Sequence, residues 1–212
     1  MTSATKPSAT KPSATLRQVI GLEAELPRLG DTTLVLIDYQ NTYTTGVMEL
    51  EGAGAALAAG ARLLGAARAA GIRVVHVVND GGEGTPYDIR AEIGAICDEV
   101  APVDGEPVVV KQFPDSFHET RLQEVLGELG VEAGAELVLA GFMTHMCVTF
   151  TAQGAFNLGY RPTVVAEATA TRTLADTDGT ALPAAVLHTA ALATIGDLFG
   201  RVAPTVDDLI TA

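Results

Sequence analysis

Short apolar runs, separated by Ala- and Leu-rich segments, give this chain its pattern. The runs Thr33–Ile37 and Leu137–Ala140 show no polar alternation, which is typical of strands buried on both faces. The other runs that predict strands are Ile72–Val78, Pro107–Val110, Pro162–Val165 and the short Arg201–Ala203.

Helical spacing of apolar residues fills the intervals between these runs. The segments that predict helices are Gly52–Ala70, a short stretch within Ile89–Ile96, His118–Leu129, Cys147–Leu158 and Leu182–Leu198. Strands and helices alternate along the chain. We therefore predict a doubly wound three-layer α/β sandwich, with a mostly parallel sheet of five or six strands in the order 3-2-1-4-5-6.

The first 15 residues differ in composition from the rest. They contain a tandem repeat, Thr5–Ala9 and Thr10–Ala14, built from Lys, Pro, Ser, Thr and Ala, with nothing to bury. Such a segment predicts a disordered tail. The remaining residues, 16–212, are long enough for one α/β domain with one core.

The net charge and the cysteine content limit the classes of partner and the cellular compartment that we expect. The formal charge is −13, from 26 acidic and 13 basic residues, so the surface should repel nucleic acids and anionic membranes. Two cysteines, Cys97 and Cys147, make no disulfide framework, and no apolar run approaches the roughly 18 residues of a membrane span. We predict a cytoplasmic protein with a small-molecule substrate.

Three chemically useful residues follow predicted strands. Asp38 follows Thr33–Ile37, Lys111 follows Pro107–Val110, and Cys147 follows Leu137–Ala140 after a short turn. Each has an ordinary interpretation by itself: a cap, a surface charge and a small buried hydrophobe, respectively. Together they lie where open α/β sheets bind ligands, at the carboxyl ends of parallel strands.

These residue types suit nucleophilic catalysis. A cysteine at or near the first turn of a helix, beside a lysine, is expected to have a lowered pKa and to react as a thiolate. Asp38 would carry the proton, and the backbone N–H groups of Met143 and Cys147 would hold an oxyanion.

The three motifs resemble the isochorismatase-like cysteine hydrolase superfamily, in its amidohydrolase branch. They are Asp38 after Leu-Val-Leu-Ile, Lys111 before Gln-Phe-Pro-Asp-Ser-Phe, and Cys147 in Gly-Phe-Met-Thr-His-Met-Cys-Val. The resemblance spans about residues 16–212. It implies an Asp-Lys-Cys triad and a non-proline cis peptide at Phe142–Met143, and Thr144 matches the family's motif.

Two departures from family patterns narrow the activity. Metal-dependent nicotinamidases place histidines soon after the aspartate, but this chain has none between Asp38 and Ile72. Its four histidines, at positions 76, 118, 145 and 188, are at least 27 residues apart and show no ligand spacing, so we predict no metal and no cofactor. Isochorismatase proper lacks the nucleophilic cysteine, so Cys147 favours cleavage of a carbon–nitrogen bond.

The sequence gives weaker indications of the substrate-binding residues and of the oligomeric state. Tyr43, Phe113, Thr144 and His145 are the candidates for substrate binding, and Cys97 is interpreted as a buried structural thiol. The Ala-rich helices favour a homo-oligomer, either a dimer or a tetramer. The competing hypotheses are an inactive family member that serves as a binding or scaffold protein, and a nucleotide-dependent oxidoreductase, which the missing glycine fingerprint disfavours.

Overall fold

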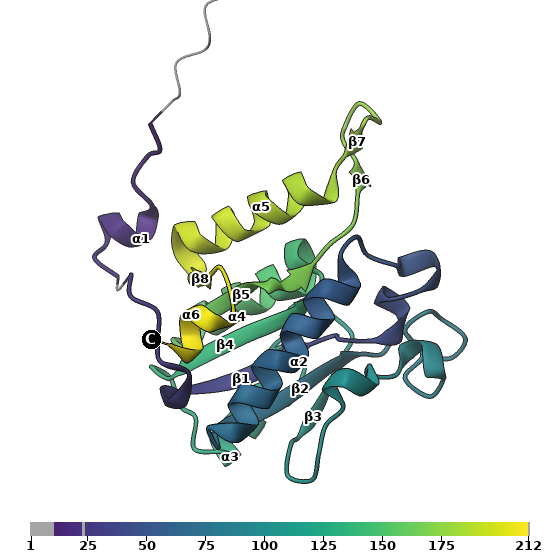
Figure 1. Ribbon diagram of the computed structural model, residues 1–212, viewed down its shortest axis with the longest axis horizontal. Coiled ribbons are helices and arrows are strands. Elements are labelled where there is room, and N and C mark those ends of the chain that lie inside the picture. Colours follow the sequence, from purple (N-terminus) through teal and green to yellow (C-terminus); the bar gives the residue numbers. More distant parts are fainter. Residues whose placement is uncertain (1–10, 23, 212) are drawn as a thin grey trace, which may run out of the picture.

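The central sheet has six strands, and every neighbouring pair is parallel (Figure 1). The computed structural model describes residues 11–22 and 24–211. The strands are β1 (Thr32–Ile37), β2 (Arg73–Asn79), β3 (Val108–Lys111), β4 (Glu136–Phe142), β5 (Arg161–Ala170) and β8 (Arg201–Ala203). They lie in the order β3-β2-β1-β4-β5-β8. The predicted fold class and strand order are confirmed, with β8 as the sixth strand.

Helices cover both faces of the sheet (Figure 1). One apolar cluster includes residues of α2 (Ala53–Ala69) and α6 (Asp207–Ile210), and the other those of α3 (Leu122–Glu128) and α4 (Thr149–Asn157). Along β1 the side chains alternate between the two clusters, because successive strand residues point to opposite faces. This explains why the run is apolar without interruption.

Two further helices lie towards the chain ends. Helix α1 (Leu16–Val19) begins with a capping box between Thr15 and Gln18, and its Leu16 N–H donates to Asp197 Oδ1 at 2.9 Å. Helix α5 (Ala184–Thr194) continues into a single π-helical turn, Ile195–Phe199. Of the predicted tail, residues 1–10 lie outside the described residues, and residues 11–15 have no regular structure.

Several predicted boundaries were wrong. Helix α3 is much shorter than His118–Leu129, and Glu119 has a left-handed backbone (φ 52°) that helices do not accommodate. The stretch around Ile89–Ile96 forms two 3-10 turns, Glu92–Gly94 and Asp98–Val100, in place of a helix.

Beyond β5 the chain forms a hairpin that the apolar pattern did not predict. Strands β6 (Leu174–Ala175) and β7 (Ala181–Leu182) pair antiparallel, and the hairpin projects from the body of the molecule (Figure 1). Two-residue strands carry too little sequence for a period to appear.

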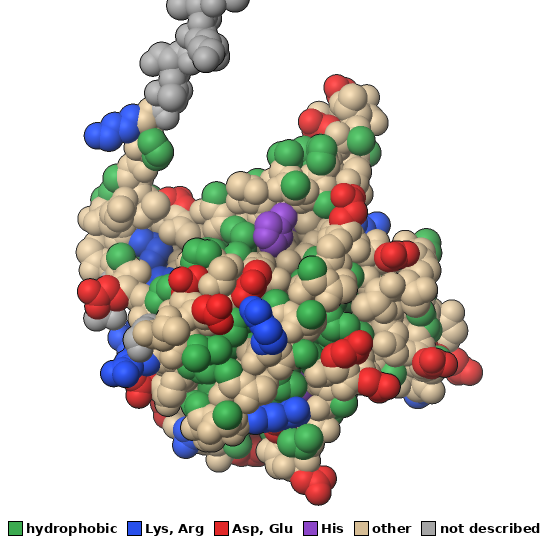
Figure 2. Space-filling view, viewed as in Figure 1, with side chains coloured by type: hydrophobic (Ala, Val, Ile, Leu, Met, Phe, Trp, Pro, Cys, Tyr) green, Lys and Arg blue, Asp and Glu red, His purple; other side chains and the backbone are tan. Residues whose placement is uncertain are grey.

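The surface is acidic, as the composition predicts. On the face seen in Figure 2, Asp and Glu side chains are dispersed among polar and apolar ones. None of the described helices has the combined length and apolar character that a membrane crossing requires.

Candidate active site

The carboxyl ends of three strands bring Asp38, Lys111 and Cys147 together. Asp38 follows β1, Lys111 is the last residue of β3, and Cys147 lies in the turn after β4. Lys111 Nζ lies 2.7 Å from Asp38 Oδ2 and donates to Cys147 Sγ at 3.3 Å. The three residues are 0%, 1% and 7% exposed, respectively. The group is therefore compact and almost closed to solvent.

The backbone around Asp38 is unusual. Asp38 has a left-handed backbone conformation (φ 52°). Residues other than glycine rarely adopt it, although Asp and Asn do so more often than most. Its N–H donates to the Val77 carbonyl at 2.9 Å, and its own carbonyl accepts from the Gln40 N–H at 2.8 Å. These bonds fix the point at which the chain turns away from β1 and aims the carboxylate.

The end of β4 approaches β1 very closely. Gly141 has φ 135°, and a Cβ atom there would lie 1.8 Å from the Ile37 carbonyl oxygen. Only glycine fits at this position. Because Ile37 precedes Asp38, this contact sets the spacing between the aspartate and the turn that carries the cysteine.

Cys147 lies in a single π-helical turn, Thr144–Val148, which precedes α4. The sequence predicts Cys147 at or near the first turn of this helix, and the residue precedes Thr149, the first residue of α4, by two positions. The Met143 carbonyl accepts hydrogen bonds from the N–H groups of Met146 at 3.0 Å and Val148 at 3.2 Å. The preceding Phe142–Met143 peptide bond is cis in the structure.

The electrostatics differ from the prediction for the thiol. Burial raises the pKa of Cys147 to about 12, with Asp38 adding to the rise and Lys111 opposing it. The expectation of a lowered cysteine pKa was wrong, because the sulfur is desolvated and faces a carboxylate as well as an ammonium. The resting group is a neutral thiol beside an Asp–Lys ion pair.

The pKa values of the two charged partners, Asp38 and Lys111, also differ from their ordinary values. The pKa of Asp38 is raised by burial, against the stabilising effect of Lys111 on the carboxylate. Burial alone would lower the pKa of Lys111, but Asp38 and Cys147 outweigh it, so that this pKa is raised. Asp38 is thus a stronger base than a surface aspartate.

Aromatic rings pack beside the three residues. The Tyr43 ring lies 5.6 Å from that of Phe142 and 5.7 Å from that of Tyr87, both edge to face. Burial raises the pKa of Tyr43, and the negative charge of Asp38 adds to this effect. Sequence reasoning did not select Tyr87, because its loop has no period that fixes its position in space.

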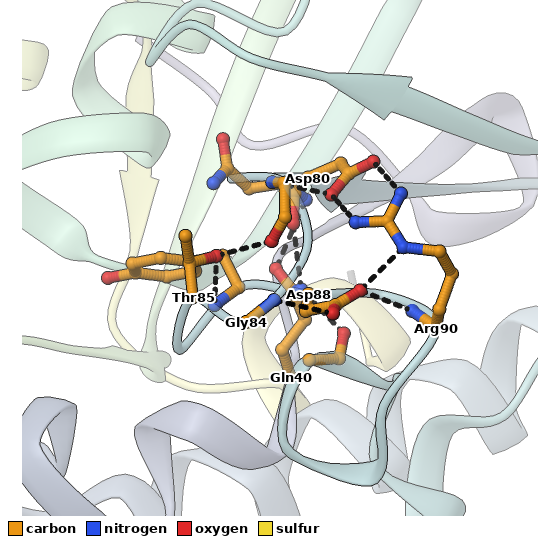
Figure 3. A network of polar contacts seen from close by, with 10 residues as sticks. Gln40, Asp80, Gly84, Thr85, Asp88 and Arg90 are labelled. Atoms are coloured by element: carbon orange, nitrogen blue, oxygen red, sulfur yellow. Dashed lines mark hydrogen bonds and ion pairs between the residues drawn. The ribbon is translucent and has the colours of Figure 1, made fainter.

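The loop that carries Tyr87 is held by a polar network, seen close up in Figure 3. The Gln40 side-chain amide donates to the Asn79 carbonyl at 3.0 Å and to the Gly94 carbonyl at 2.7 Å, and so ties both ends of the loop to the chain after β1. Arg90 contacts Asp88 at 2.7 Å and Asp80 at 3.2 Å (Figure 3). The carboxylates of Asp80 and Asp88 thereby brace the loop.

The other predicted binding residues are not all brought together. Thr144 is fully buried, and its Oγ1 lies 3.0 Å from His188 Nδ1. His145 is half-buried and hydrogen bonds through Nδ1 to Thr171 Oγ1. Phe113 is 41% exposed and packs against His118, with ring centroids 4.7 Å apart.

The structure also bears on metal binding and on the second cysteine, Cys97. Within the described ranges, no three His, Cys, Asp or Glu side chains are grouped so that they could hold a metal ion. Cys97 is buried and free, as predicted for a structural thiol, and its backbone N–H donates to the Tyr39 carbonyl at 2.8 Å.

Comparison with known proteins decides the family. Residues 32–205 match the Isochorismatase domain. The chain belongs to the isochorismatase family. This isochorismatase-family chain is 34% identical over 194 residues to a secreted isochorismatase effector of Verticillium dahliae, covering 91% of the chain and 98% of that protein.

Two further relatives come from Pseudomonas putida. The family member described here is 34% identical over 157 residues to a maleamate amidohydrolase, covering 63% of the chain and 70% of that protein. The crystal structure of an isochorismatase from the same species has a TM-score of 0.88 at 37% identity, covering 94% of this chain and 100% of the other. The family inferred from the three motifs is thus confirmed.

Proposed function

We propose that this protein is a metal-independent cysteine hydrolase that cleaves a carbon–nitrogen bond in a small amide, ureido or lactam substrate. The main support is the position of Lys111 Nζ, in contact with both Asp38 and the Cys147 sulfur inside the protein. Relatives named streptothricin hydrolase, maleamate amidohydrolase and ureidoacrylate amidohydrolase support a hydrolase acting on such bonds.

The first half of the proposed reaction forms an acyl-cysteine. Cys147 Sγ attacks the substrate carbonyl carbon while its proton passes to Asp38, whose raised pKa suits a base. Lys111 stabilises the negative charge as it moves from carboxylate to sulfur. The tetrahedral intermediate then collapses, the carbon–nitrogen bond breaks, and Asp38 returns the proton to the leaving nitrogen.

The second half hydrolyses the thioester. Asp38 takes a proton from a water molecule as the water oxygen attacks the acyl carbon, and the carbon–sulfur bond breaks. The departing Cys147 sulfur recovers the proton from Asp38. The products are a carboxylic or carbamic acid and an amine or ammonia, and the three residues return to their starting state.

The oxyanion of each tetrahedral intermediate needs hydrogen-bond donors. We assign this role to the backbone N–H groups of Met143 and Cys147. In support, the Met143 N–H donates no hydrogen bond to any residue in ranges 11–22 and 24–211. It is thus a donor without an internal partner, next to the sulfur-bearing turn.

A mass-spectrometric screen with a panel of amides tests this function. Wild-type protein should release ammonia or amine and carry a trapped acyl adduct on Cys147 after rapid quenching. Cys147→Ala should show neither, and chelators should leave the wild-type rate unchanged. Undiminished turnover by Cys147→Ala would contradict the nucleophile assignment.

One observation favours the alternative of a binding or scaffold protein without turnover. A thiol with a pKa of about 12 is unreactive unless a base removes its proton during attack. Asp38 is adjacent to act as that base, which is why we favour catalysis. The same screen discriminates, because a scaffold protein would form no adduct with any amide while its fold stays intact.

We also propose that the chain forms a homo-oligomer. Helix α5 has no Asp, Glu, Lys or Arg in its 11 residues, yet only Ala184 and Ala191 are buried in it. A groove of about 400 Å³ runs between α5 and the start of α2, with alanines on both walls. Exposed apolar surface of this kind is typical of subunit contacts.

The compartment remains a prediction. Two free cysteines fit a reducing cytoplasm, whereas one relative is named a secreted effector. Fractionation of the native cell would decide between them.

A further inference from the structure

A cavity lies at the amino end of the sheet, away from the candidate active site. It has a volume of about 330 Å³ and is lined by residues of α1, β5, β8, the end of α4 and the π-helical turn Ile195–Phe199. Arg161 is the first residue of β5 and Arg201 the first of β8, whereas the three candidate catalytic residues lie at or beyond the last residues of their strands. Since the strands are parallel and β4 spans seven residues, the cavity and the candidate active site are roughly 20 Å apart.

Cationic and aromatic side chains line this cavity together. They are three arginines and three rings, namely Arg17, Arg161, Arg201, Phe156, Tyr160 and Phe199. Among the described residues of the lining, none is acidic. The Phe156 and Phe199 rings are tilted against each other, with their centroids 6.2 Å apart. A cavity of this size that combines apolar walls with a few convergent polar groups is typical of a ligand site.

Arg201 carries the main evidence that the ligand is charged. Its side chain is 6% exposed, its Nη2 contacts the Glu136 carboxylate, and its Nη1 donates to the Glu25 carbonyl at 2.8 Å. Its Nε is shielded from solvent and has no hydrogen-bond partner within residues 11–22 and 24–211. A buried guanidinium N–H without an acceptor is costly, so an acceptor supplied by a ligand would stabilise this side chain.

One carboxylate serves two of the three arginines. Glu136 contacts Arg201 through Oε2 and Arg161 through Oε1, the latter at 2.9 Å. The third arginine, Arg17, donates through Nη1 to the Leu198 carbonyl at 3.3 Å. Burial lowers the pKa of Arg17, and the positive charge of Arg201 lowers it further, with Glu136 opposing both. The guanidiniums of Arg17 and Arg201 therefore repel each other, and an anion between them would relieve that repulsion.

We propose that this cavity binds a small aromatic carboxylate, as a ligand site separate from the candidate active site. The carboxylate lies against Arg17 and Arg201, because a guanidinium offers N–H donors in a planar fork that matches two carboxylate oxygens. The ring packs among Phe156, Tyr160 and Phe199, since aromatic rings gain from edge-to-face and offset-stacked contacts. No step of the proposed hydrolysis uses this cavity, so the inference stands or falls independently of that function.

Calorimetric titration of the full-length protein tests the chemistry of this site. The aromatic probes are benzoate and phenylacetate. Acetate, which lacks the ring, and benzyl alcohol, which lacks the charge, are the controls. At low ionic strength, at least one aromatic carboxylate should bind about 10-fold or more tightly than either control, because only it engages both the arginines and the rings. If neither aromatic carboxylate binds, the proposal is wrong.

Variants of Arg17 test whether the arginines hold the anion. Arg17→Met should weaken binding of the aromatic carboxylate by about 10- to 100-fold, the range expected for a hydrogen bond to a charged group. Arg17→Lys, which keeps the charge but loses the fork, should have an intermediate affinity. Arg121→Met is the matched control, because the Arg121 side chain is 66% exposed and pairs with Glu124 on α3. Equal affinities for Arg17→Met and wild type would overturn the proposal.

Photolabelling locates the site in the wild-type protein and does not depend on any variant folding. After irradiation with 4-azidobenzoate, peptide mapping should find the label in residues 156–162 or 199–201, and excess benzoate should suppress it. Label found instead in residues 142–147 would place the ligand in the candidate active site and refute a separate cavity site.

Discussion

Lys111 Nζ lies 2.7 Å from Asp38 Oδ2, and neither side chain reaches solvent. A buried ion pair gains little net stability, because both charges lose their hydration. Removing one partner is different, since the other is left as an uncompensated charge. The pair is therefore a place where stability and reactivity can be separated by mutation.

Lys111→Met should lower the free energy of unfolding by about 3–5 kcal/mol and reduce kcat/KM by roughly a thousandfold or more. The double variant Asp38→Asn, Lys111→Met should recover much of the stability but none of the activity. Denaturant unfolding and steady-state rates on a substrate found by the screen measure both. Recovery of activity in the double variant would contradict the proposed roles.

The raised pKa of Cys147 predicts how alkylation depends on pH. With a pKa of about 12, only about 10⁻⁴ of the sulfur is thiolate at pH 8. The iodoacetamide rate at Cys147 in the free protein should rise about tenfold per pH unit, with no plateau below pH 10. Lys111 lowers this pKa, so Lys111→Met should slow alkylation further. A plateau near pH 7 would instead indicate the lowered pKa expected from the sequence.

Gly141→Ala tests the close approach of β1 and β4. The new Cβ would lie 1.8 Å from the Ile37 carbonyl oxygen, in a backbone conformation that L side chains rarely adopt. We expect a loss of more than about 3 kcal/mol of stability, or no folding. Gly65→Ala, in helix α2 with open space around it, should be neutral or stabilising by about 0.5–1 kcal/mol. Thermal unfolding followed by circular dichroism compares the two.

The lowered pKa of Glu106 predicts that the free energy of unfolding decreases at acid pH. Its carboxylate contacts Arg68 and the buried His76, both at 2.8 Å, and the Arg68 bond is the main reason that its pKa falls to about 2. A lowered folded-state pKa stabilises the fold above the unfolded value near 4.5, and this stability is lost as the pH falls towards 2.

Glu106→Gln should accordingly unfold more easily than wild type at pH 7, by about 3 kcal/mol at most, and the two should converge near pH 2. Glu124→Gln, which removes an exposed carboxylate paired with Arg121, should differ little from wild type at any pH. A constant difference between Glu106→Gln and wild type from pH 7 to pH 2 would refute the assignment.

A charge on α5 tests the proposed oligomer. Val186 is 51% exposed on this helix, and Val186→Lys should shift the protein to a smaller species in light scattering after size exclusion. Val103 is 52% exposed in a loop elsewhere, and Val103→Lys should leave the size unchanged. An unchanged size for both variants would exclude α5 as the contact.

The sheet and the three reactive residues could be predicted because their signals are local. A strand buried on both faces is apolar throughout, and a polar residue that follows it stands at the ligand-binding edge of a parallel sheet. Asp38 follows such a run directly, and Cys147 follows one after a short turn. Lys111 ends an apolar run on the edge strand β3, where Val108 and Val110 are exposed. To predict that the three residues lie together, only the strand order was needed in addition, and the alternation of strands and helices implied that order.

What the sequence could not provide depends on burial and on loops. Spacing alone favours a reactive thiolate at Cys147, but its pKa is set by desolvation and by the distance to Asp38, which only coordinates supply. Tyr87 lies in an irregular segment, where no period fixes a side chain in space. Phe113, which we expect to line the pocket because it lies near a strand end, is 41% exposed and packs against His118.

The three candidate catalytic residues lie at or just after strand ends, whereas Tyr87 comes from a connecting loop that is held by its own polar contacts. We therefore expect mutations in that loop to change substrate preference while the strand ends, and with them the candidate catalytic geometry, stay in place.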